Sequence, residues 1–312
     1  MNTVAAVAIA GGLLLSTSAA AGAVDSGSTA GPLGAVLSGS AGGAPEIGGP
    51  TGAIPVNTPQ LASVANFRDA AGDEGEGYVT EDGKHMRRGI FFRSNGLDKT
   101  SDADLAALAA LGVADIYDLR GPTESTNPMV GGPDKVPAGA ELKTLPIEFG
   151  DLVGLAGTIT TPEAGRKFME DANRSFVTDP AKRDQFGKLL TSLAHENGAQ
   201  VFHCSSGKDR TGWTAMLLQE IAGLSDQTIR DDYLASNDRL KAVNEKTLAM
   251  ISKMVSPESA AALAPVLAVD PSYLEAGLAQ IKSDYGSVDA YLRDGLGLDD
   301  GTLAVLKTKL VV

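Results

Sequence analysis

Cysteine is almost absent from this chain of 312 residues, which contains a single one, Cys204. An intramolecular disulfide is therefore excluded, and the fold must rely on its hydrophobic core. Basic residues are also few: 26 Lys and Arg stand against 39 Asp and Glu, so the net charge is −13. This balance argues against a nucleic-acid partner and against electrostatic binding to anionic membranes. A site for phosphate would have to produce its positive field locally.

A long apolar run occurs near the N-terminus, where residues 4–15 have the length of a signal-peptide core and are too short to span a bilayer. Small residues suited to cleavage follow at 19–21 and 21–23. A basic segment before the run is missing, and a buried alanine-rich helix is the alternative interpretation. We expect a signal peptide over 1–23, an exported protein (secreted or in the cell envelope) and no stable membrane anchor. The oligomeric state stays open.

Large apolar residues are scarce between residues 24 and 60, where Gly, Ala, Ser and Pro dominate. Such a segment cannot bury enough surface to offset the entropy lost on ordering. We therefore predict a disordered leader over 24–60 and one catalytic domain over 61–312.

Strand and helix patterns alternate in the first part of this domain, and helical patterns fill the second part. Strands are expected at 89–94, 113–120 and 199–204, with an extended piece at 142–147. Helices are expected at 102–112, 163–177, 181–197, 211–222, 225–237, 238–254, 257–267, 271–285, 287–294 and 300–310. The order predicts an α/β fold of three layers, with a central, mainly parallel sheet and additional C-terminal helices.

The stretch HCSSGKDRTG, residues 203–212, contains the single cysteine. A buried strand is expected to end at His203 and a helix to begin near Arg210, so the loop between them would wrap into a bowl. The bowl's N–H groups can point inward at the positive end of a helix dipole, and Gly207 allows the positive φ that this needs. A phosphate group suits this bowl. The residues expected to bind it are Ser205, Ser206, Gly207, Lys208, Asp209 and Arg210.

Cys204 would lie at the bottom of the bowl as a thiolate, in line with a bound phosphate ester. Arg210 can hold two phosphate oxygens with its planar guanidinium. The Thr211 hydroxyl can donate to the sulfur and ease its departure, while His203 would orient the backbone or the thiolate. The loop therefore predicts nucleophilic catalysis through a cysteinyl-phosphate intermediate, with no metal or other cofactor.

Other interpretations of the loop are weaker. Phe202 and Asp209 occupy positions where a nucleotide-binding P-loop needs Gly and then Ser or Thr. One cysteine and three histidines argue against a zinc site. A cysteine protease would need a separate histidine base across from the thiol. A buried structural cysteine, an inactive phosphate-binding module and a sulfurtransferase remain as alternatives.

HCSSGKDRTG resembles the signature loop of the cysteine-dependent tyrosine phosphatases, and more narrowly that of their atypical bacterial branch, whose loops overlap in chemistry with those of phosphoinositide phosphatases. Weaker blocks support the branch: NFRDAAG (66–72), RRGIFFRSNGL (87–97), DIYDLRGPTE (115–124), IRDDYLASN (229–237) and YLRDGLGL (291–298). Ala70, Ala71 and Ser206 depart from its pattern. The resemblance implies hydrolysis of phosphoryl monoesters on proteins by Cys204, with Arg210 binding phosphate. Lys208 beside Asp209 resembles loops of broad specificity, which makes a preference for phosphoinositides the alternative.

The general acid that protonates the leaving group is usually an aspartate on a separate loop, and the sequence offers several. Asp118, after the second expected strand, is our first candidate, although it could instead be a structural partner of Arg120. Asp209 inside the loop is the second candidate, and Asp69 and Asp151 follow. A candidate must reach to within hydrogen-bonding distance of the leaving oxygen, which spacing alone does not show.

Residues 238–268 lie outside the minimal phosphatase core. The resemblance implies that such an insertion covers the active site as a lid, and apolar residues including Met250, Met254 and Leu263 would give it an adaptable face. An ordinary packed pair of helices is the alternative.

Overall fold

The structure is a computed structural model, and it describes residues 58–127, 131–149 and 158–312. The predicted signal peptide, nearly all of the predicted leader and the candidate acid Asp151 lie outside the described residues.

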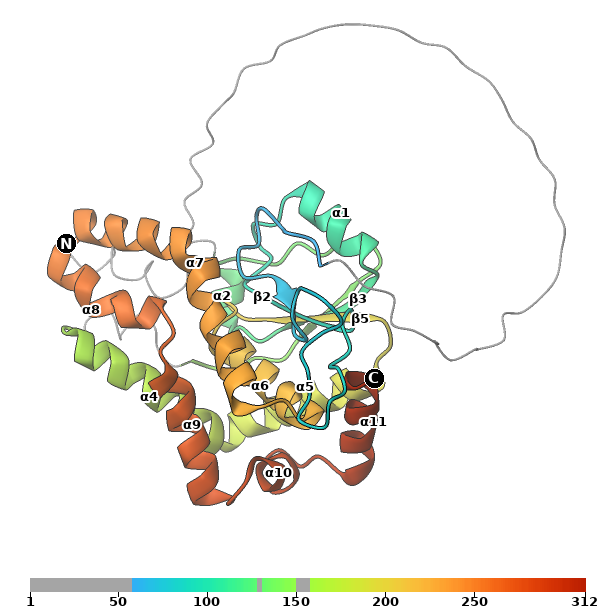
Figure 1. Ribbon diagram of the computed structural model, residues 1–312. Coiled ribbons are helices and arrows are strands. Elements are labelled where there is room, and N and C mark those ends of the chain that lie inside the picture. The colour runs from blue at the N-terminus through green and yellow to red at the C-terminus, as the bar shows by residue number, and fades with distance from the viewer. Residues whose placement is uncertain (1–57, 128–130, 150–157) are drawn as a thin grey trace, which may run out of the picture. The chain divides into compact units, whose positions relative to one another are not determined.

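A sheet of five strands forms the centre of the described domain (Figure 1). The strands run in the order β1-β2-β5-β3-β4. β1 pairs antiparallel with β2, whereas the pairs β2–β5, β5–β3 and β3–β4 are parallel. The bounds are Arg68–Asp69 for β1, Phe91–Ser94 for β2, Val113–Asp118 for β3, Glu141–Thr144 for β4 and Ala199–His203 for β5. In such a sheet the carboxyl ends of parallel strands share one edge, where ligands bind.

Successive residues of the central strands supply two separate cores, because side chains alternate between the faces of a strand. Phe92 and Val201 pack with Leu108 of α1 (Asp102–Ala110) on one face. Phe91 and Phe202 pack on the other face, where α5 (Pro180–His195), α6 (Arg210–Ala222) and α11 (Asp300–Leu310) contribute. Figure 1 shows α1 on one side of the sheet and these helices on the other. The predicted three-layer α/β fold is confirmed.

Four of the helices begin with a capping side chain followed by proline at the first helical position. Thr161, Asp179, Ser256 and Asp270 each accept a hydrogen bond from a backbone N–H of the first turn. Proline is tolerated there because its missing N–H would have no partner in the helix. These signals start α4 (Pro162–Thr178), α5, α8 (Pro257–Leu267) and α9 (Pro271–Asp284). The other helical elements of the described residues are α2 (Pro122–Thr126), α7 (Asp226–Met254), α10 (Val288–Ala290) and a π-helical turn at Tyr291–Gly295.

The segments expected as separate helices at 225–237 and 238–254 form one helix, α7, of 29 residues. No Gly or Pro interrupts this stretch, so nothing in the backbone ends the helix at Asn237. The Asn237 amide instead hydrogen bonds with both the N–H and the carbonyl of Val269, at 2.9 and 2.8 Å. Two other short elements, β1 and α2, did not stand out in the sequence.

Candidate active site

The signature loop connects the carboxyl end of β5 to the first turn of α6, as its sequence indicated. Residues outside the loop donate hydrogen bonds to several of its carbonyl groups. The Gly96 N–H donates to the Ser205 carbonyl at 3.1 Å, and the Asn66 side-chain amide donates to the carbonyls of Ser206 and Gly207 at 3.0 Å each. Within the described residues, no backbone carbonyl accepts from the N–H groups of 205–209. The loop thus leaves these donors for a bound anion.

Two buried arginines extend this support from outside the loop. Arg93 of β2 donates to the Gly207 carbonyl at 3.1 Å and to Asp232 of α7 at 2.6 Å. Arg68 of β1 donates to the same carboxylate at 3.0 Å. Burial alone would raise the pKa of Asp232, but the two arginines hold it at about 2. The NFRD block and the DDYLASN block therefore meet behind the loop and anchor it.

Cys204 is buried, with 1% of its surface exposed. Burial alone would raise the pKa of its thiol. The charge of Arg210 and the hydroxyl and N–H of Thr211 outweigh that effect, so the pKa lies below its ordinary value. Asp209 acts in the opposite direction, which places its carboxylate within electrostatic reach of the sulfur. The loop therefore favours the thiolate, the reactive form of cysteine.

Glu124 binds Arg210 and is a site residue that the sequence pattern did not reveal. The two guanidinium NH₂ groups donate to the two Glu124 carboxylate oxygens at 2.7 Å each. The Ser205 hydroxyl donates to the same carboxylate. Burial would raise the pKa of Glu124, but Arg210 and Ser205 lower it to about 2. A fixed carboxylate orients the arginine, and the closing residue of the block DIYDLRGPTE was its only sequence signal.

The segment after β4 forms another wall around Arg210. The carbonyl of Ile147 accepts from the guanidinium at 3.2 Å, and the Phe149 ring lies 5.2 Å from it. The Glu148 carboxylate lies so close to Gly121 that a Cβ there would stand 2.5 Å from it. Glu148 is exposed, so this acidic side chain lies near the site with access to solvent. Nothing in the sequence distinguished it from the other acidic residues of 121–160.

Lys208 and Asp209 form an ion pair in which the Lys208 amine lies 3.1 Å from the nearer carboxylate oxygen. The same amine donates to the carbonyls of Val266 at 2.9 Å and Ala268 at 3.1 Å. These carbonyls close the C-terminal end of α8, so the predicted lid segment contacts the signature loop through Lys208. Lys208 is 3% exposed and is therefore no solvated charge at the rim of the loop.

Asp118 lies at the end of β3, and both of its carboxylate oxygens accept from Arg120 at 2.9 Å. Asp118 is thus bound as a structural partner of Arg120, which was the alternative to a role as general acid. Asp69 lies in β1, where its carboxylate accepts from the N–H groups of Ala71 and Gly89. Burial raises the pKa of Asp69 to about 7. Asp118 approaches the signature stretch at His203, whose Nδ1 lies 3.9 Å from its carboxylate, and Asp69 has no contact with that stretch among those that the structure describes.

His203 is fully buried, and its Nδ1 lies 3.3 Å from the carbonyl oxygen of Cys204. With Asp118 and Asp134 it forms a group whose ligand atoms lie within 4.8 Å of one another, a spacing that a metal ion could bridge. The guanidinium of Arg120 contacts both carboxylates, at 2.9 and 2.8 Å, and supplies positive charge at this place.

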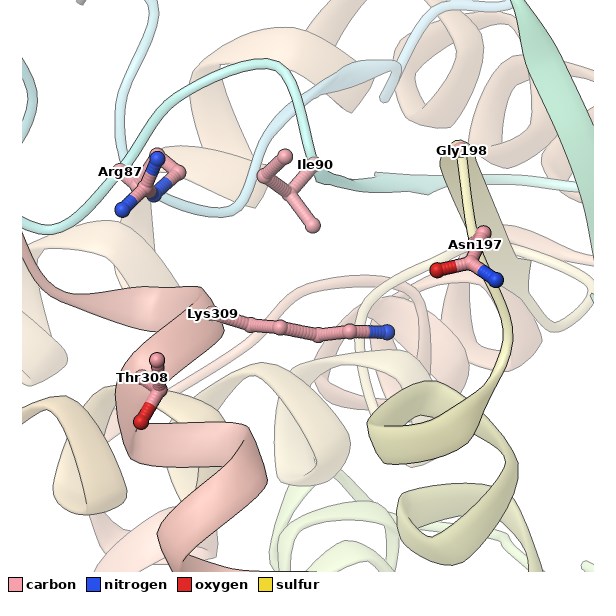
Figure 2. Close-up of a pocket in the computed structure, with 6 residues that line it drawn as sticks. All are labelled: Arg87, Ile90, Asn197, Gly198, Thr308 and Lys309. Atoms are coloured by element: carbon pink, nitrogen blue, oxygen red, sulfur yellow. The ribbon is translucent and has the colours of Figure 1, made fainter. Parts of the chain in front are cut away.

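A separate pocket lies at the N-terminal ends of β2 and β5, whereas the signature loop follows the carboxyl end of β5. Its lining comprises Arg87, Ile90, Asn197, Gly198, Thr308 and Lys309. Figure 2 shows Lys309 extending along one side of it toward Asn197. The Lys309 amine donates to the carbonyls of Leu193, at 3.0 Å, and Glu196 at the end of α5. The pocket thus lies away from the signature loop.

Of the helices described, none is both long and apolar enough to cross a membrane.

A cysteine and an arginine in a strand–loop–helix bowl define a cysteine-dependent phosphatase by fold and site together. The model of the tyrosine phosphatase family matches residues 59–312. A Cupriavidus necator protein whose name assigns it to the tyrosine-protein phosphatases is 32% identical over 245 residues, covering 76% of this chain and 83% of its own length. The triple specificity protein phosphatase PtpB of Mycobacterium tuberculosis is 31% identical over 284 residues, covering 78% and 95%. The chain belongs to the tyrosine phosphatase family, which confirms the resemblance inferred from its loop.

Proposed function

We propose that this phosphatase hydrolyses phosphoryl monoesters through a cysteinyl-phosphate intermediate, with Cys204 as the nucleophile. Arg210, oriented by Glu124, and the N–H groups of 205–209 would hold the three non-bridging oxygens. Thr211 would stabilise the thiolate when it leaves in the second step. The observation that carries this proposal is the bowl itself: a thiol of lowered pKa beside backbone N–H donors that have no acceptor among the described residues.

Asp209 is the general acid that the geometry favours over Asp118. Its carboxylate lies within electrostatic reach of both the Cys204 sulfur and the Arg210 guanidinium, whereas both oxygens of Asp118 are taken by Arg120. The Lys208 amine beside Asp209 can position that carboxylate. We therefore infer that Asp209 protonates the leaving oxygen and afterwards activates the water.

The substitution Asp209→Asn tests this assignment. For a phosphoserine peptide, whose leaving group needs a proton, we expect kcat/KM, which reports the first step alone, to fall about 100-fold. For an aryl phosphate with an acidic phenol we expect a much smaller loss, because that leaving group departs without a proton. Steady-state kinetics on both substrates measure the difference. Asp118→Asn is the control: it should lower stability and affect the two substrates equally. A leaving-group effect in Asp118→Asn, and none in Asp209→Asn, would reverse the assignment.

Broad specificity is the second part of the proposal. One relative is named a triple specificity phosphatase. The donors of the bowl include the backbone N–H groups of 205–209, which would contact the phosphate rather than its ester group. Phosphotyrosine, phosphoserine and phosphothreonine on proteins are therefore proposed substrates, and a phosphoinositide is the alternative with the same chemistry.

Phosphate release in the absence of metal, at pH 5 to 7, tests the function as a whole. The full chain and Cys204→Ser would be compared on a phosphotyrosine peptide, a phosphoserine peptide and a phosphoinositide in mixed micelles. Release that disappears in Cys204→Ser supports the proposal, and the ranking of substrates chooses between protein and lipid. Absence of release with phosphate still bound would favour an inactive phosphate-binding module. Release that persists in Cys204→Ser would refute the nucleophile.

We also propose that the protein is exported. The apolar run at 4–15 and the small residues at 19–23 support this. N-terminal sequencing of the protein recovered from outside the cytoplasm should then begin shortly after residue 21 or 23, whereas recovery of the intact N-terminus from the cytoplasm would contradict it.

A further inference from the structure

The side chain of His203 lies between two oxygen atoms behind the signature loop. Its Nδ1 is 3.3 Å from the carbonyl oxygen of Cys204, and its Nε2 is 3.0 Å from a carboxylate oxygen of Asp134. Both oxygens can only accept hydrogen bonds, and a neutral imidazole carries a hydrogen on just one nitrogen. A neutral ring would therefore turn a lone pair toward one of these oxygens. The imidazolium, with a hydrogen on each nitrogen, avoids this.

The charges around the ring lead to the same protonation state. His203 faces the carboxylates of Asp134 and, at 3.9 Å, Asp118, and the guanidinium of Arg120 contacts both carboxylates. All four side chains are at most 3% exposed. Two negative groups and one arginine would leave a buried net charge, which is costly, and a positive His203 balances it. Burial alone would lower the pKa of His203, but the two carboxylates outweigh it and raise the pKa.

Asp134 is held in place for this contact. Its other carboxylate oxygen accepts from the Leu97 N–H at 2.8 Å, and Arg120 lies 2.8 Å from the oxygen that faces His203. Burial would raise the pKa of Asp134, but His203 and Arg120 lower it to about 2, so it stays charged. The Nε2–H does not aim straight at the carboxylate, so the contact acts as a buried ion pair rather than a linear hydrogen bond.

We propose that Asp134 is a positioning residue that keeps His203 doubly protonated, so that the Nδ1–H of the imidazolium donates to the Cys204 carbonyl. This bond orients the first peptide of the signature loop. It also places a positive charge beside Cys204, opposed by the Asp118 carboxylate 3.9 Å from Nδ1, while the Asp134 carboxylate lies at Nε2 on the far side of the ring. The positive ring thereby adds to the charge of Arg210 in stabilising the thiolate. The consequence for catalysis rests on the proposed function, but the protonation state does not.

The protonation state can be read directly by ¹⁵N NMR of the histidine rings in the full chain. The chain has three histidines, and a His203→Gln variant identifies the signal of His203. We expect both ring nitrogens of His203 to be protonated at pH 7, above the ordinary pKa of 6.5. In Asp134→Asn we expect the ring to lose a proton below its ordinary pKa of 6.5, because burial then favours the neutral form. A wild-type ring that is neutral at pH 7 would overturn the proposal, whether or not the variant folds.

The effect on the nucleophile is measured by the rate of Cys204 alkylation with iodoacetamide as a function of pH. Asp134→Asn should move the midpoint of thiolate formation upward, with alkylation at least about threefold slower on the acidic side of that midpoint. Asp104→Asn, which removes a similarly buried carboxylate that bonds Ser63 and not the loop, should leave the midpoint unchanged. An unmoved midpoint in Asp134→Asn would refute the positioning role. Alkylation does not require turnover, so this outcome is independent of whether phosphate is released.

Discussion

At the scale of single residues, Gly207 meets two separate demands. Its φ is 69°, a backbone conformation that residues with a side chain rarely adopt. A Cβ at this position would also lie 2.3 Å from the Ser94 carbonyl oxygen and 2.6 Å from the Asn95 nitrogen. The loop can therefore approach the end of β2 only because this residue has no side chain.

The substitution Gly207→Ala should cost at least about 3 kcal/mol in the free energy of unfolding and abolish turnover. Gly83→Ala is the matched control. Its φ is 82°, but a Cβ there would meet nothing within 4 Å, so it should cost about 1 kcal/mol from backbone strain alone. Urea denaturation of the two variants measures the difference. Equal losses would mean that the close approach to β2 adds nothing.

Two residues of the site illustrate what spacing along the chain could not reveal. Glu124 and Asp134 precede the signature loop by about 80 and 70 residues; Glu124 closes the block DIYDLRGPTE without an assigned role there, and Asp134 follows no recognised pattern. They come to the loop because β3 lies beside β5 in the sheet and the chain after β3 turns back across its carboxyl end. Asp118 was the more visible candidate, since it ends a strand, but its carboxylate is held by Arg120.

At the scale of elements, Asp232 ties α7 to the sheet. Its carboxylate is 1% exposed and accepts from Arg68 and Arg93, and also from Gln219 of α6. The ion pair joins β1, β2 and α7 at the point where Arg93 also holds the signature loop. Loss of the carboxylate would leave two buried arginines without a counter-charge.

Asp232→Asn should therefore lower the free energy of unfolding by about 3 kcal/mol at pH 6. The pKa of Asp232 is about 2 in the folded protein against an ordinary value of 3.8, so its contribution is present above pH 4 and is lost as the pH falls toward 2. The difference between wild type and variant should accordingly shrink in urea denaturation at pH 3. Asp231→Asn, on the exposed side of the same helix, is the control and should change little. A difference that does not depend on pH would contradict this account.

The predicted lid over 238–268 is a second question at this scale. Its residues include the second half of α7 and all of α8, and Ile251 and Leu263 form a small core with Ile159. α8 approaches α4 so closely that a Cβ at Gly165 would lie 2.6 Å from the Ala262 carbonyl oxygen. A larger side chain at this position should push α8 away and weaken the contact of Lys208 with Val266 and Ala268.

Gly165→Leu should make Cys204 react with iodoacetamide at least about tenfold faster at a temperature well below unfolding, because α8 no longer covers the loop. Gly187→Leu is the matched control. It creates a similar clash, with the Leu296 carbonyl 2.3 Å from the new Cβ, on a part of α5 away from the lid. It should lower the midpoint of thermal unfolding without faster alkylation. Equal alkylation in wild type and Gly165→Leu would leave α7 and α8 as an ordinary packed pair.

At the scale of the whole molecule, the folded domain should be independent of the predicted leader. The match to the family begins at residue 59, and Leu61 and Val64 are buried in the core that contains α1. The N–H groups of Ala62 and Ser63 also donate to Asp104 in the first turn of α1. The segment 61–64 is therefore part of the domain.

A protein that begins at residue 58 should have the same thermal midpoint and the same kcat as one that begins at residue 24. A protein that begins at residue 66 should unfold several degrees lower, because it loses two buried side chains and the bonds to Asp104. Differential scanning calorimetry measures both. A loss of stability on removal of 24–57 would show that the predicted leader contributes to the fold.

Features that depend on residues close together in the chain could be predicted from the sequence. Strand and helix periodicity predicted the three layers, and one stretch of ten residues predicted the nucleophile, the arginine and the bowl. These features depend on neighbours along the chain, such as a buried strand, a glycine and a helix start, so the sequence contains them. The continuity of α7 was not predicted, although no Gly or Pro interrupts the stretch, and the Asn237 side chain instead hydrogen bonds with Val269.

The partners of the loop required the folded chain. Glu124 on Arg210, Asp134 behind His203, and the end of α8 on Lys208 are contacts between segments separated by about 60 to 90 residues. Sheet order and helix packing bring these segments together, and an acidic residue on a loop looks alike in sequence whether it faces solvent or an arginine. The physical reason is that a charge acquires its role from the burial and counter-charges around it, and these exist only after the layers have packed.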